Sequence, residues 1–91
     1  MTSKNHDLQL AIGKAQDATQ ELNYFVSRLP RHFGDCARDL KSGKPVSVEN
    51  ISYQGTTLKA RATAALRAIA TLHAMAAETF PQSAVDDQEA A

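Results

Sequence analysis

The stretch from Ser47 to Phe80 constrains the fold most, because its apolar residues return every three or four positions. This spacing places them on one side of a helix, with polar residues at the positions between. The apolar residues are Ile51, Leu58, Ala62, Ala65, Leu66, Ile69, Leu72, Ala76 and Phe80. The pattern predicts a long amphipathic helix with Ser47 as its N-cap and its end before Pro81. The many alanines favour helix formation and leave room for a second helix to approach closely.

A second stripe, earlier in the chain, predicts the helix that packs against the first. It consists of Leu8, Ala11, Ile12, Ala15, Ala18, Leu22, Phe25, Val26 and Leu29. Positions 8, 15, 22 and 29 repeat every seven residues, which is typical of helices packed side by side at a shallow angle. We expect this helix to begin near Asn5 to Asp7. It should stop at Pro30, which cannot donate the next backbone hydrogen bond.

After Pro30, the residues from Arg31 to Lys41 have the pattern of a short connecting helix, and residues 42–45 that of a loop. The expected fold is therefore all-α, an antiparallel hairpin of two long helices with a short connecting helix. Residues 7–81 should form one helical domain. Residues 1–6 should be a flexible N-terminus and residues 82–91 a disordered acidic tail without large apolar side chains apart from Val85.

The length of the second long helix predicts self-association. From residue 47 to 80 it would extend about 50 Å, whereas a first helix ending at Pro30 covers only about 35 Å of it. Either the long helix bends near Gly55, or a second copy of the chain covers the remainder. We expect the second outcome, a homodimer that forms a helical bundle. Its seam would include Leu58, Ala62, Ala65 and Ile69.

The charges are unevenly distributed although they sum to zero. The net charge is −1 over residues 1–27, +5 over residues 28–67 and −4 over residues 68–91. A basic middle suits either nucleic acid or an acidic protein surface, but a neutral total falls short of the strongly basic domain typical of DNA binders. The single cysteine, Cys36, and the lack of a secretory or membrane-spanning pattern indicate a cytoplasmic protein without membrane contact.

No residue pattern indicates chemistry at an active site. His32 and Cys36 lie four positions apart, a spacing that suits two metal ligands, but the only other histidines are at unrelated spacings. No combination of nucleophile, base and orienting group can be assembled, and no glycine-rich phosphate loop is present. We therefore expect neither an enzyme nor a bound metal or cofactor.

Two segments together resemble a known family. They are AIGKAQDATQELNYFVSRLP, which ends at Pro30, and ISYQGTTLKARATAALRAIATLHAMAAETFP, which ends at Pro81. In layout they are similar to the TraM family of quorum-sensing antiactivators, in which two long antiparallel helices form dimers. Members bind TraR, a transcriptional regulator of the LuxR type, and prevent it from holding DNA. The resemblance implies functional roles for Leu29 and Tyr53, but the connector here, from Phe33 to Lys44, is longer and more basic.

Two hypotheses for the function follow. In the first, the protein is an antiactivator that sequesters a LuxR-type activator through Leu29, Tyr53, Phe33, Tyr24, Arg31 and Arg38. Tyr53 is two residues from Ile51, which turns it away from the stripe by about 200° and makes it a candidate hot spot. In the second, the chain is a small phage- or plasmid-type accessory protein whose basic middle binds nucleic acid or a nucleoprotein complex. A helix-turn-helix arrangement is disfavoured because residues 48–51 lack basic side chains.

Overall fold

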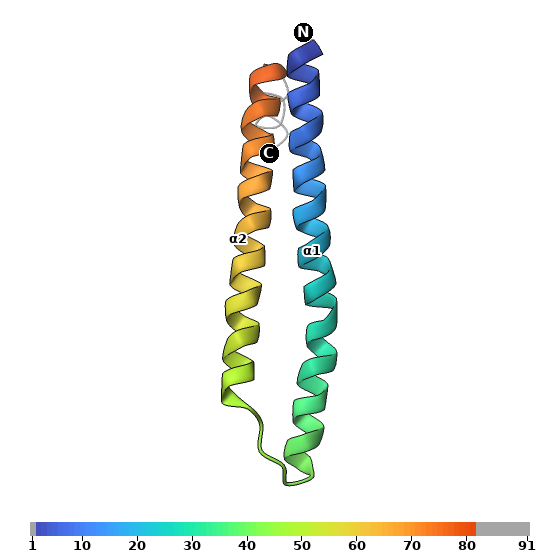
Figure 1. Ribbon diagram of the computed structural model, residues 1–91, viewed down its shortest axis with the longest axis vertical. Helices are drawn as coiled ribbons and strands as arrows, with labels where there is room; N and C mark the ends of the chain where they lie inside the picture. The colour runs from blue at the N-terminus through green and yellow to red at the C-terminus, as the bar shows by residue number, and fades with distance from the viewer. Residues whose placement is uncertain (1, 82–91) are drawn as a thin grey trace.

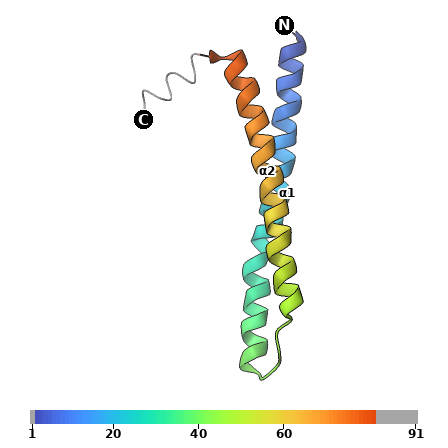
Figure 2. The same cartoon turned by 90° about the vertical axis from the view of Figure 1, so that its left-hand side faces the viewer.

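The chain folds into two long helices that run antiparallel as a hairpin. The computed structural model describes residues 2–81, which form α1 (Thr2–Lys41), a short connection and α2 (Val48–Thr79) (Figure 1). In Figure 2, turned by 90°, the two helices cross near the middle of their length. The described residues contain no strand. The predicted all-α hairpin is therefore confirmed.

The predicted break at Pro30 is wrong, because α1 continues through this proline. Consequently, residues 31–41 are the last turns of α1 and not a separate connecting helix. The proline costs one backbone hydrogen bond and crowds the carbonyl of Val26, a penalty of about 3 kcal/mol. Pro30 itself is exposed, whereas Leu29, His32 and Cys36 around it are half-buried. Burial on both sides of the proline therefore offsets a local preference that alone would end the helix. α1 also begins at Thr2, a few residues before the predicted start.

The connection between the helices is fixed by backbone hydrogen bonds and a cap. Lys44 N donates to the carbonyl of Asp39 at 2.8 Å, and Gly43 N donates to that of Leu40 at 3.1 Å. Gly43 has a φ of +84°, a conformation that glycine adopts without strain. Ser47 then accepts a hydrogen bond from Asn50 N at 3.1 Å, which confirms the predicted N-cap.

α2 does not extend beyond α1, although the dimer prediction assumed that it does. α2 runs without a break through Gly55 and has 32 residues, but α1 has 40. At 1.5 Å per residue α1 is about 60 Å long and α2 about 48 Å, so α1 covers the whole of α2. The predicted overhang of the second helix is therefore wrong.

The contact between the two helices is a narrow seam in which residues alternate at intervals of three and four. On α1 the seam holds Leu8, Ala11, Ala15, Ala18, Leu22, Phe25, Leu29, His32 and Cys36. On α2 it holds Gln54, Leu58, Arg61, Ala65, Ala68, Leu72, Met75 and Thr79. This repeat is that of an antiparallel coiled coil.

The seam provides very little core. Among the described residues, only three apolar side chains are buried, and all are alanines: Ala11, Ala15 and Ala65. The radius of gyration is 19.4 Å, against about 12 Å for a compact chain of this length. Within residues 2–81, twelve large apolar side chains remain exposed. The hairpin therefore exposes a large apolar surface to which another molecule could bind.

Candidate protein-binding surfaces

One side of the hairpin carries an open groove with charged walls, which we call the charged groove. It has a volume of about 1050 Å³, and its lining residues, 17–35 of α1 and 53–61 of α2, belong mostly to the half of the hairpin nearer the connection. Its apolar and aromatic lining includes Tyr24, Phe25, Leu29 and Tyr53. Its charged lining consists of Asp17, Glu21, Arg28, Arg31, Asp35 and Arg61. Three negative and three positive groups line this wall, so the groove has no single sign of charge.

A tyrosine and an arginine on α1 form a joint surface at the groove. The guanidinium carbon of Arg28 lies 5.4 Å from the centre of the Tyr24 ring, and Nη1 donates to the Tyr24 hydroxyl at 3.3 Å. Stacking of this kind contributes about 0.5–1 kcal/mol when exposed. Tyr24 is nevertheless 65% exposed. The pair therefore presents a flat, partly ordered surface suited to a protein partner.

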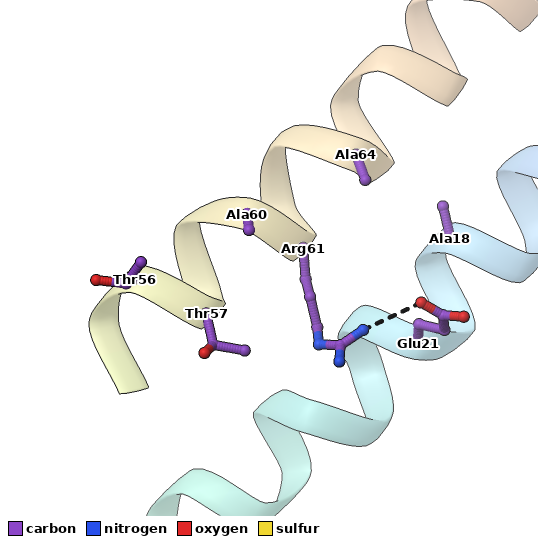
Figure 3. Close-up of a pocket in the computed structure, with 7 residues that line it drawn as sticks. All are labelled: Ala18, Glu21, Thr56, Thr57, Ala60, Arg61 and Ala64. Atoms are coloured by element: carbon purple, nitrogen blue, oxygen red, sulfur yellow. Dashed lines mark hydrogen bonds and ion pairs between the residues drawn. The ribbon is translucent and has the colours of Figure 1, made fainter. Parts of the chain in front are cut away.

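Arg61, a charged residue at a seam position of α2, links the two helices. Its Nη1 donates to Glu21 Oε1 at 3.1 Å, and its guanidinium carbon lies 6.0 Å from the centre of the Phe25 ring. Figure 3 shows the side chain reaching from α2 to Glu21 on α1. The Nε atom is buried and has no hydrogen-bond partner. A smaller pocket of about 430 Å³ lies beside it, lined in part by Ala18, Thr57 and Ala64.

Four of the six residues predicted to bind a partner meet in the charged groove: Tyr24, Leu29, Arg31 and Tyr53. Tyr53 is 63% exposed, in agreement with its offset from Ile51. The other two, Phe33 and Arg38, do not line it. Arg38 pairs with Asp35, Nη2 to Oδ1 at 2.7 Å, and so lies at its edge. Phe33 belongs to the other side of the hairpin.

Two rows of positions on that other side hold no charged residue, and we call these rows the uncharged face. Glu21, Arg28 and Asp35 of α1 share the charged groove with Thr57 of α2, so these positions flank one side of the seam. The positions that flank the other side form two rows with a seven-residue repeat. On α1 the row is Ile12, Thr19, Val26, Phe33 and Leu40, and on α2 it is Val48, Gly55, Ala62, Ile69 and Ala76. None of the ten is charged, which makes the hairpin amphipathic as a whole.

The residues predicted for the dimer seam divide between two places. Leu58 and Ala65 belong to the seam within the hairpin, and Ala65 is only 3% exposed. Ala62 and Ile69 lie on the uncharged face, where Ile69 is 46% exposed. Only the second pair is therefore placed to meet another molecule.

The sequence did not predict the ion pair at the groove or the α1 half of the uncharged face. Glu21 and Arg61 were not singled out, since their contact spans forty positions and depends on the pairing of the helices. Ile12 and Val26 were assigned to the stripe that packs against α2, although they are 48% and 40% exposed. A signal was present in the sequence: the row from Ile12 to Leu40 repeats every seven residues without a charge.

His32 and Cys36 lie side by side on α1, with Sγ 3.9 Å from Nε2. The described part of the chain brings no third histidine, cysteine or carboxylate to them. Neither α1 nor α2 is long and apolar enough to cross a membrane. No protein-family model, curated protein or solved structure matches this chain.

Proposed function

We propose that this chain is a non-catalytic protein-binding domain that holds a partner protein in the charged groove. The observation that carries the proposal is the convergence of Tyr24, Leu29 and Tyr53 from two helices in one open groove. Aromatic residues and arginine dominate the binding energy of protein interfaces. Tyr24 and Tyr53 are 65% and 63% exposed, so they do little to stabilise the hairpin itself.

The charges of the groove favour a protein partner over nucleic acid. Asp17, Glu21 and Asp35 line the groove together with three arginines, and a phosphate backbone would approach both signs at once. A protein surface can match such a pattern, since complementary charges set the specificity and orientation of a complex. Nucleic-acid binding through the basic residues near the connection is thus the weaker alternative. It predicts a steep fall in affinity for duplex DNA as salt rises.

The more specific proposal is that the partner is a LuxR-type transcriptional activator. Its support is that Leu29 and Tyr53, to which the TraM resemblance assigns functional roles, lie in the same groove although 24 positions separate them. The chain would act stoichiometrically, by occupying the activator so that it cannot hold DNA. This mechanism needs no catalytic group and no cofactor.

The test measures affinity and stability on the same variant. Tyr53→Ala should weaken binding to a LuxR-type activator about 30-fold, equivalent to about 2 kcal/mol, the size of a hot-spot truncation. Its helix content and melting temperature should stay near those of the wild type because Tyr53 is exposed. Leu66→Ala is the matched control, since Leu66 is 67% exposed on the same helix but does not line the groove. Equal effects of the two variants on binding would contradict the proposal.

A further inference from the structure

We propose that a second copy of this chain covers the uncharged face, and that the two hairpins pack antiparallel into a four-helix bundle. This inference goes beyond the proposed function, because it concerns the opposite side of the hairpin. Both charged grooves would face outward and stay open to a partner. The failure of either proposal would leave the other standing.

The first support is the amount of surface that the hairpin leaves uncovered. The accessible surface of the chain is 7319 Å², whereas a compact monomer of 9.8 kDa exposes about 5,200 Å². The excess is larger than the about 800 Å² that each partner buries in a standard interface. On the uncharged face, Phe33 is 47% exposed and Leu40 is 64% exposed. Exposed apolar surface of this extent marks an interaction site.

The second support is the shape of the face, which fits a copy of itself. The pairing of Glu21 with Arg61 places residues whose numbers add to about 82 at the same height along the hairpin. Bulky Phe33 and Val48 therefore lie together toward the connection, and Ile12 and Ile69 lie together toward the termini. Small Gly55 and Ala62 occupy the middle of the α2 row. A two-fold axis across the middle of the face would pack the connection end of one hairpin against the terminal end of the other. It would also bring the small residues of the two hairpins together at the centre.

The third support is the distribution of charge along the hairpin. Residues 28–49, toward the connection, contain five cationic and three anionic side chains. Residues 2–16 and 68–81, at the other end, contain two cationic and two anionic side chains. An antiparallel arrangement keeps the two basic ends of the hairpins apart, whereas a parallel one places them side by side. Charge thus selects between two orientations that apolar contact alone would allow.

Sedimentation equilibrium of the full chain, from about 1 to 100 µM, tests the association. We expect twice the chain mass of 9.8 kDa at the upper concentrations. Val26→Glu, which places a charge on the uncharged face, should raise the dimer dissociation constant at least about 100-fold. Ser27→Glu adds the same charge one residue further on, away from both rows. It should change the dimer dissociation constant less than about threefold. A wild-type monomer at 100 µM would overturn the proposal, even if Val26→Glu failed to fold. Equal effects of the two glutamates would also overturn it.

A distance measurement tests the orientation. A spin label at Lys44→Cys, in a Cys36→Ser background, marks the connection of each hairpin. In the antiparallel dimer the two labels lie at opposite ends, separated by a distance approaching the long dimension of 62 Å. A separation below about 30 Å would place both connections at one end and overturn the antiparallel arrangement.

Discussion

Replacing Pro30 by alanine should stabilise this protein. Within a helix, proline is about 3 kcal/mol less favourable than alanine. Pro30 is exposed, so little packing is lost, and the new N–H can donate to the carbonyl of Val26, four residues before it. The substitution also frees the unfolded chain, which subtracts about 0.4–1 kcal/mol. The net gain should be about 2 kcal/mol, or about 8–16 °C in melting temperature for a domain of this size.

The assay is thermal and urea unfolding followed by circular dichroism at 222 nm. Pro45→Ala is the matched control, because Pro45 lies in the connection, outside both helices. There the freer unfolded chain should lower stability by about 0.4–1 kcal/mol with no helical gain to offset it. Unchanged or reduced stability of Pro30→Ala would mean that α1 does not continue through residue 30, and the reasoning from seam burial would be refuted.

Three further predictions concern the seam and the glycines. Gly13→Ala should raise the unfolding free energy by about 0.5–1 kcal/mol, since its added methyl group meets no atom within 4 Å. Gly55→Ala should raise it less, because the methyl group adds bulk to the face that a second copy covers. Equal gains of the two variants in urea unfolding would contradict this difference. Arg61→Leu should raise the unfolding free energy by about 1 kcal/mol, because the exposed ion pair contributes under about 1 kcal/mol and the buried Nε is unpaired. A fall in the unfolding free energy of more than about 1 kcal/mol would show that the ion pair with Glu21 contributes more to stability than this. Ala65→Leu should lower it by about 1–3 kcal/mol through overpacking, and an unchanged melting temperature would show that the seam is looser than its 3% exposure indicates.

The periodicity of the sequence predicted the helices and their pairing well. Leu8, Ala15, Leu22 and Leu29 all lie in the seam, as their seven-residue repeat predicts. The capping of α2 by Ser47 was also predictable, since this interaction is local. Such features depend on residues close in sequence or on a strict repeat.

The continuity of α1 was not predictable from local rules. Proline ends helices because of its own chemistry, but here the seam residues on either side hold the helix together. This outcome depends on α2 lying alongside, which local preference does not include. For the same reason, the predicted stripe of the first helix included residues that do not lie in the seam. Ile12 and Val26 share the apolar character of the seam but flank it, and only the position of α2 separates the two rows.

The charged groove was only partly predictable. Tyr53 could be placed outward from its angle on the helix, but its shared groove with Tyr24 depends on the register between α1 and α2. That register also brings Arg61 to Glu21. Single residues of the site were therefore accessible from the sequence, whereas their grouping was not.

The proposed dimer implies that a single hairpin is incomplete and that a second copy completes it. The concentration dependence of thermal unfolding shows whether the hairpin needs this second copy in order to be stable. If folding and dimerisation are coupled, a hundredfold rise in concentration should stabilise the folded dimer by about 2.7 kcal/mol. For two chains together this corresponds to an increase of about 5–11 °C in melting temperature. The same melting temperature at about 5 and 500 µM would show that the hairpin is stable alone and would contradict the claim.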